Sequence, residues 1–249
     1  MSNGRILRSS QIIILGVCIA AATIVSSIIF SKGFMKVMRF THEVITVTGS
    51  AQKEITSDYA VWYGEFSRRD ADLATAYRSL KDDLEKVKTH LISKGVKETD
   101  ITVSQALTQT FYKKNEKGND TNEIEGYCLK MSVCVQSNDV NGLEKMSRES
   151  TELIDQGIHF ESHPPEYFYT KLEELKIEML ANATENAKMR AEKMAQATGN
   201  RIGSIRSAKM GVFQITPVNS TEVADWGVND TSSLIKKMTA VVTVSIAIE

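Results

Sequence analysis

The sequence predicts an α+β fold in which helices pack on one face of antiparallel sheets, in two sublobes preceded by one transmembrane helix. Two observations support this class. An uncharged apolar run lies near the amino terminus, and the rest of the chain alternates pairs of strand-like segments with amphipathic helices. Of the 249 residues, 42% are hydrophobic and 24% are charged, which is typical of a folded protein and not of a disordered one.

The apolar run covers residues 12–30 and contains no charged side chain. As a helix it would span about 28 Å, close to the hydrocarbon thickness of a bilayer. We expect an uncleaved signal anchor, with residues 1–39 as the anchor and its basic flanks. The alternative is a cleaved signal peptide with its cleavage site at Ala20–Ala22. The anchor is favoured because the apolar run continues for eight residues past Ala22.

Charge is distributed unevenly along the chain. Residues 1–39 hold five basic residues and no acidic one, which leaves 25 basic and 31 acidic residues, a net charge of −6, in residues 40–249. An acidic body argues against a nucleic-acid partner and against electrostatic binding to anionic lipid. Basic residues flank the apolar run on both sides, so the positive-inside count leaves its orientation open. Cys18 follows Val17, which is too bulky for a lipoprotein cleavage site, so lipidation is not expected.

After the anchor, the sequence predicts strands at residues 44–48 and 59–67. A helix follows, capped by Asp70 or Asp72 and ended by Gly95. Its apolar residues recur at three- and four-residue steps. They are Leu73, Tyr77, Leu80, Leu84, Val87 and Leu91.

Two longer strands are predicted at residues 101–112 and 124–136, separated by a charged loop at 113–122. The second strand alternates, with one apolar face. This face carries Tyr127, Leu129, Met131, Val133 and Val135. Asp139 is expected to cap a shorter helix carrying Val140, Leu143, Met146 and Leu153. A weak boundary near Asn138 divides the single ectodomain, residues 40–249, into sublobes at 40–138 and 139–249.

The last part of the chain contains an extended segment at residues 158–162, a long helix at 170–198 and strands at 202–215 and 238–248. The helix carries alanines at four-residue spacing, namely Ala183, Ala187, Ala191 and Ala195. Such a ladder allows close approach to a sheet or another helix, although alanine is also simply a good helix former. The last strand is apolar on one face and polar on the other, which is typical of a sheet with one solvated side. A polar loop at 219–233 contains Trp226.

We expect no catalytic, cofactor-binding or metal-binding residues. The histidines are His42, His90, His159 and His163. The last two flank an extended segment and would lie about 13 Å apart, too far to chelate one metal ion. The carboxylates Glu173, Glu174 and Glu178 could in principle form an acid–base set, but they lie in a helical charge run typical of a solvated face.

Cys128 and Cys134 lie six residues apart in one predicted strand. Their Cα atoms would be about 20 Å apart, whereas a disulfide needs less than about 7 Å. We interpret them as half-buried thiols. Redox-sensitive or intermolecular thiols in an oxidising compartment are the alternative.

Several segments, taken in order over residues 43–249, resemble the SIMPL-domain family of bacterial envelope proteins. Val47–Gly49 followed by Ser57–Val61 resembles the first strand pair of the family, and Asn186–Ala195 is the most family-like stretch. The further matching segments are Leu91–Ser104, Tyr127–Val135, Asp139–Leu143, Gly199, Arg201–Gly203 and Val241–Ile248. Ser57 stands where the family usually has proline, and Ala51 where a second glycine is common.

The resemblance implies a two-sublobe fold facing the periplasm, tolerance of oxidative or envelope stress, and assembly into rings or channel-like oligomers. It also implies a cytoplasmic amino terminus and carries no catalytic residue over to this chain. Three hypotheses follow. The first is a non-enzymatic, membrane-tethered homo-oligomer in the bacterial inner membrane, or a form secreted to the periplasm after cleavage. The second is an adaptor that binds a protein partner through Glu166–Tyr169 or the loop around Trp226. The third is an enzyme with an unrecognised site.

Overall fold

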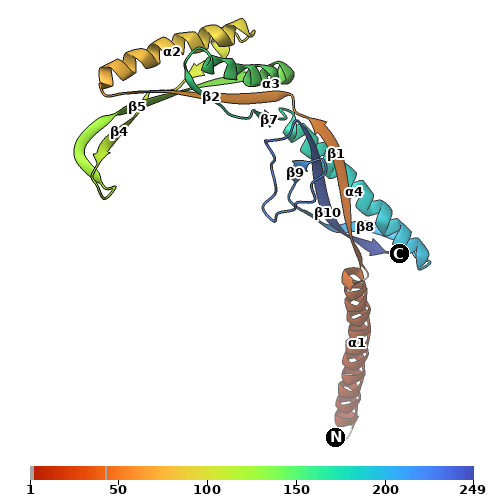
Figure 1. The fold of residues 1–249 in the computed structure, drawn as a ribbon. Helices are drawn as coiled ribbons and strands as arrows, with labels where there is room; N and C mark the ends of the chain where they lie inside the picture. The colour runs from red at the N-terminus through yellow and green to blue at the C-terminus, as the bar shows by residue number, and fades with distance from the viewer. Residues whose placement is uncertain (1–2, 43) are drawn as a thin grey trace. The chain divides into compact units, whose positions relative to one another are not determined.

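The fold is described from a computed structural model covering residues 3–42 and 44–249 (Figure 1). The helices are α1 (Asn3–His42), α2 (Leu73–Ser93), α3 (Val140–Glu149) and α4 (Leu172–Ala197), with short 3₁₀ helices at Glu98–Asp100 and Ser150–Ile154. The strands are β1 (Val44–Thr56), β2 (Tyr59–Asp70), β3 (Ile101–Val103), β4 (Leu107–Lys114), β5 (Asp120–Ser137), β6 (His159–Ser162), β7 (Glu166–Phe168), β8 (Ile202–Met210), β9 (Gln214–Pro217) and β10 (Ile235–Ile248). The paired strands are antiparallel, and the predicted α+β class is confirmed.

The chain forms two compact units, each assembled from separate stretches of sequence. The first unit contains the described residues up to Ser50, together with Leu180–Gly211 and Val241–Glu249. The second contains Ala51–Met179 and Val212–Ala240. The expected boundary near Asn138 lies within the second unit, between β5 and α3, and a division into sublobes at that point stays a prediction.

In the first unit, β10 lies between β1 and β8, and α4 packs on one face of this sheet (Figure 1). The alanine ladder of α4 is fully buried, and a Cβ added to Gly49 of β1 would lie 2.3 Å from the backbone oxygen of Ala183. The close approach that the ladder allows is therefore confirmed. On the opposite face, the hydroxyls of Thr48 and Thr243 are 3.1 Å apart, so this side is polar, as the alternation predicts.

Side chains of α4 also satisfy backbone groups of the edge strand β1. The Asn186 side chain accepts a hydrogen bond from the Ser50 N–H at 3.2 Å, and the Arg190 guanidinium donates to the Thr48 carbonyl at 2.8 Å. Unpaired groups on an edge strand invite pairing with another chain. These two contacts cover part of the β1 edge and fix the helix along the strand.

In the second unit, β2 and β5 form a long antiparallel pair, with β3 and β4 on β5 and with β6 and β7 on β2. The helices α2 and α3 cover one face of this sheet (Figure 1). Trp62, Phe66 and Val133 from the sheet are buried in one cluster with Leu80 and Leu91 from α2. The alternation predicted for residues 124–136 is confirmed, since Leu129, Met131, Val133 and Val135 are all buried.

The predicted helix ends are confirmed. Asp72, rather than Asp70, caps α2 and accepts hydrogen bonds from the Thr75 hydroxyl and N–H, and these hold the pKa of the Asp72 carboxyl below its ordinary value. Asp139 caps α3 through the Gly142 N–H at 3.0 Å. Gly95 follows α2 with a φ of 95°, a conformation that residues with a Cβ rarely adopt.

Two predicted strands are interrupted, each for the same reason. The strand expected at residues 101–112 divides into β3 and β4. The reason is that the chain advances four residues from Val103 to Leu107 while the paired strand β5 advances only three. The strand expected at 202–215 divides into β8 and β9 in the same manner against β10. Each extra residue is a bulge that breaks the ladder. The Ser104 hydroxyl fills the first break by accepting a hydrogen bond from the Ser132 N–H at 2.8 Å.

Candidate membrane anchor and binding surfaces

The apolar part of α1 is the clearest functional element of the chain. The segment Ile14–Met35 is 22 residues long, its most apolar 18 residues have a mean hydropathy of 2.3, and its side chains are exposed. A helix of this length extends about 33 Å, enough to cross a bilayer. The Thr23 hydroxyl donates to the Ala20 carbonyl at 2.9 Å, so this polar group is satisfied within the helix. The segment is a candidate membrane anchor or signal sequence, and it extends past residue 30, where the predicted run ends.

The four histidines considered above as possible metal ligands lie in separate places. His42 is the last residue of α1, His90 is buried in α2, and His159 in β6 contacts the Ser67 hydroxyl at 3.1 Å through its Nδ1. His163 follows β6, and its N–H donates to the Tyr63 carbonyl. Within residues 3–42 and 44–249, no three histidine, cysteine, aspartate or glutamate side chains are grouped so that they could hold a metal ion.

The carboxylates singled out on the long helix are engaged on its surface. Glu178 pairs with Lys53 at 2.8 Å, Glu173 pairs with Lys176 at 2.6 Å, and Glu174 is exposed. These are exposed ion pairs, which contribute little to stability. The arrangement matches the solvated helical face that the charge run indicates.

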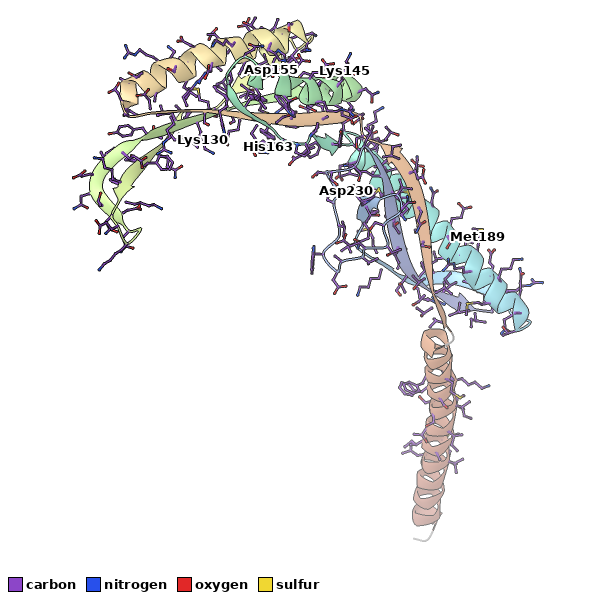
Figure 2. The ribbon with its side chains drawn as sticks, viewed as in Figure 1. Lys130, Lys145, Asp155, His163, Met189 and Asp230 are labelled. Carbon is purple, nitrogen blue, oxygen red and sulfur yellow. The ribbon has the colours of Figure 1, made fainter. Side chains whose placement is uncertain are left out.

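Cys128 and Cys134 are free, half-buried thiols on the face of the sheet opposite α2 and α3. Figure 2 labels Lys130 on this same face, where its ammonium pairs with Glu65 at 2.7 Å. Cys134 lies opposite Tyr63 on β2, and its charge and hydrogen bond raise the pKa of the Tyr63 phenol. Cys128 lies opposite Arg69 on the same strand, so the two cysteines have different cross-strand neighbours, as expected for thiols far apart on β5.

The two contact surfaces of the adaptor hypothesis differ in exposure. Trp226, in the loop before β10, is 88% exposed, and Val223 beside it is also exposed. By contrast, the first three residues of the segment Glu166–Tyr169 form β7, and Tyr167 at the centre of this strand is buried in the core. Sequence reasoning did not anticipate this strand, because three residues next to two prolines give no alternating pattern. The loop is therefore the better contact surface of the two.

Comparison with known proteins identifies the domain. The model of the SIMPL family, a protein of unknown function (DUF541), matches residues 45–246. The chain belongs to the SIMPL family. The family match covers β1 through most of β10, so both units are parts of the SIMPL domain and α1 lies before it.

The SIMPL domain also has a similar curated relative. The chain is 27% identical over 164 residues to the interleukin-1 receptor-associated kinase 1-binding protein 1 homolog of Xenopus laevis, across 64% of this chain and 60% of the relative. The chain thus spans less than two thirds of that protein.

Likeness to solved structures is low. The de novo designed protein Foldit4 matches with a TM-score of 0.21 and 17% identity, covering 42% of this chain and 93% of the design. An amidase of the hydantoinase/carbamoylase family from Burkholderia phymatum matches with a TM-score of 0.28 and 11% identity, covering 52% of this chain and 34% of the amidase. At these TM-scores neither structure informs the function of the SIMPL domain.

Proposed function

We propose that the protein is a non-enzymatic SIMPL protein tethered in the bacterial inner membrane, with its domain in the periplasm. In this proposal it assembles with copies of itself and contributes to tolerance of oxidative or envelope stress. The observation that carries the proposal is the exposed apolar segment Ile14–Met35, which ends eight residues before the first strand of the domain. A span of that length holds the domain at the membrane surface.

Self-assembly is supported by the exposed edge of the first unit. Among the residues that the structure describes, β8 pairs with β10 alone, and most residues of β8 are exposed, including Ile205 and Met210. An exposed edge strand with apolar side chains is a surface on which another strand can pair. A second copy of the chain that pairs along β8 would cover these apolar side chains.

Topology and processing are tested first. The chain is fused at its carboxyl terminus to alkaline phosphatase, which is active only outside the cytoplasm, or to a fluorescent protein that matures only inside. We expect active phosphatase and no fluorescence, together with an intact mass that retains residues 12–30. Fluorescence, or a soluble product lacking these residues, contradicts the tethered periplasmic form.

Self-assembly is tested by the native mass of the full-length protein in mild detergent, measured by light scattering. We expect a discrete oligomer that Ile205→Lys dissociates, because the new charge would be buried at the edge. Ile154→Lys is the matched control, since Ile154 is equally apolar and similarly exposed but belongs to the second unit. A monomer, or equal loss of mass in both variants, refutes the assembly. Unchanged peroxide survival in a deletion strain refutes the link to stress.

A second candidate function is an adaptor that binds one specific protein partner. Two observations favour it: the exposure of Trp226, and a relative whose name describes binding to a kinase. Exposed tryptophans are enriched among residues that dominate binding energies. Capture from crosslinked membranes should enrich one partner that is lost with Trp226→Ala and kept with Trp226→Phe. Equal capture by both variants contradicts this role.

A further inference from the structure

A cavity of about 480 Å³ lies within the second unit, between the last turn of α3 and the turn from β6 to β7. His163, labelled in Figure 2, lies on that turn. Pro164 and Pro165 continue the same wall and give it an apolar surface. The cavity plays no part in the membrane tether or the exposed strand edge described above.

Tyr167 makes this cavity more than a surface hollow. The residue is only 7% exposed, its ring belongs to the core, and it lines the cavity. Among the residues that the structure describes, no group is hydrogen-bonded to its hydroxyl, and this hydroxyl is not one of the buried atoms without a partner, so it reaches the solvent in the cavity and is free to bind a ligand. Burial and the Glu144 carboxylate raise the pKa of the Tyr167 phenol, which Arg148 lowers by less, so at neutral pH the phenol is protonated and can donate.

The remaining hydroxyls at the cavity have their protons engaged. Their donor contacts are Ser147 to the Glu144 carbonyl (2.8 Å), Thr151 to the Arg148 carbonyl (2.9 Å), Ser162 to the Ser147 carbonyl (2.7 Å) and Ser232 to the Asp230 carboxylate (2.7 Å). The donors left to a ligand are therefore the Tyr167 hydroxyl, the His163 ring and the Arg148 guanidinium.

Arg148 supplies positive charge to this wall. Its Nη2 donates to Glu144 at 2.8 Å in a pair one helical turn apart, and its side chain is 73% exposed. The pair with Glu144 uses one of the five guanidinium N–H groups of Arg148. The remaining N–H groups can donate to a ligand, and their planar, forked arrangement suits a carboxylate. Glu144 lines the same cavity and offsets the charge of Arg148. One offset cation suits a monoanion better than a dianion such as phosphate.

We propose that this cavity binds a monocarboxylate, with Arg148 and the Tyr167 hydroxyl donating to the carboxylate and Pro164 and Pro165 contacting the adjacent carbon atoms. The carboxylate can belong to a small organic acid or to the end of a peptide chain, because both offer the same planar pair of acceptors. Binding replaces water at the Tyr167 hydroxyl with a charged acceptor, and a hydrogen bond to a charged group is stronger than one between neutral groups.

The test uses the full-length protein in mild detergent, with ¹³C at the ζ carbon of its tyrosines, a position sensitive to hydrogen bonding of the phenol. Tyr167→Phe identifies the Tyr167 signal. The two probes are butyrate, which represents a small organic acid, and N-acetylalanine, which mimics the end of a peptide chain. Each should shift the Tyr167 signal saturably, with a dissociation constant on the order of 1 mM. The probe that binds more tightly identifies the source of the carboxylate. The Tyr59 signal should not move, because the Tyr59 hydroxyl already donates to Gln136 at 2.6 Å.

Two comparisons make the test specific. Arg148→Gln should weaken carboxylate binding about tenfold or more. Arg78→Gln, which removes an arginine from another exposed position, on α2, should leave carboxylate binding unchanged. The neutral isostere butanamide should not shift the Tyr167 signal at the same concentration. Four results overturn the proposal: an equal shift with butanamide, tighter binding of phosphate, full binding by Arg148→Gln, or no shift with either carboxylate.

Discussion

Replacing Gly49 with alanine tests the contact between β1 and α4. A Cβ at this position would lie 2.3 Å from the Ala183 oxygen, 2.3 Å from the Ala187 nitrogen and 2.7 Å from the Ala187 Cα. All three are backbone atoms of α4, so no side-chain rotation relieves the overlap. The helix must move away from the sheet, which separates the buried alanine ladder from β1.

The expected loss follows from two opposing effects. Forcing an extra methyl group into a well-packed contact costs about 1–3 kcal/mol, and rigid backbone neighbours place this site at the upper end. Removing a glycine from a strand returns about 0.5–1 kcal/mol, mainly by restricting the unfolded chain. We therefore expect Gly49→Ala to lower the free energy of unfolding by about 2 kcal/mol, which lowers the melting temperature of a chain of this size by roughly 4–8 °C.

Gly203→Ala is the matched control in the same unit. A Cβ at Gly203 would meet the Glu249 carboxylate at 2.6 Å, but that group is the end of a flexible side chain that can turn away. Both variants are unfolded in urea as full-length protein in mild detergent and followed by circular dichroism. We expect Gly203→Ala to stay within about 0.5 kcal/mol of wild type. Equal effects of the two substitutions would refute the argument that backbone contact, rather than loss of a glycine, decides the cost.

Three further predictions rest on the second unit. Asp83 is 1% exposed and pairs with Arg68, so Arg68→Met should cost about 3 kcal/mol in the same urea titration, because it leaves the buried carboxylate with the more distant Lys86 ammonium at 3.7 Å. Adding Asp83→Leu to this variant should restore part of the loss. An equal loss in the single and double variants would contradict the pairing. The lowered pKa of Asp72 means that its cap stabilises α2 fully above about pH 4 and is lost as the pH falls through the folded-state value. Asp72→Asn should therefore flatten the dependence of the urea midpoint on pH between about 5 and 2, and an unchanged slope would exclude the cap as its source. After mild oxidation, Cys128 and Cys134 of one chain should both still react with an alkylating reagent, because β5 holds the two thiols too far apart to form a disulfide. An intrachain disulfide between them, detected by mass spectrometry, would contradict this geometry.

Local signals in the sequence were read correctly where their cause is local. Asp72 and Asp139 cap helices because a carboxylate can reach an N–H only a few residues away. Gly95 ends α2 because its own backbone conformation requires glycine. The alternation of β5 follows from the geometry of a single strand, and the apolar run of α1 from composition. None of these features depends on which distant residues lie nearby.

The tertiary structure explains why two family-like stretches belong together. Gly49 ends the segment Val47–Gly49, and Asn186–Ala195 lies on α4, more than 130 positions later in the sequence. In the fold, Gly49 allows α4 to approach, and Asn186 and Arg190 bond to the backbone on either side of it. The alanine spacing suggested a close contact, but only the fold shows that the partner is β1.

The sequence by itself determined the helices and the longer strands, the helix caps, the buried face of the central strand and the apolar segment near the amino terminus. The tertiary structure decided the strand order, the bulges that divide two predicted strands, the pairing of Arg68 with the buried Asp83, and the cavity that Tyr167 and Arg148 line. The physical reason is range. Helix and strand periodicity and capping act over a few residues and are written in the local sequence, whereas register, ion pairs and cavities depend on side chains that only folding brings together.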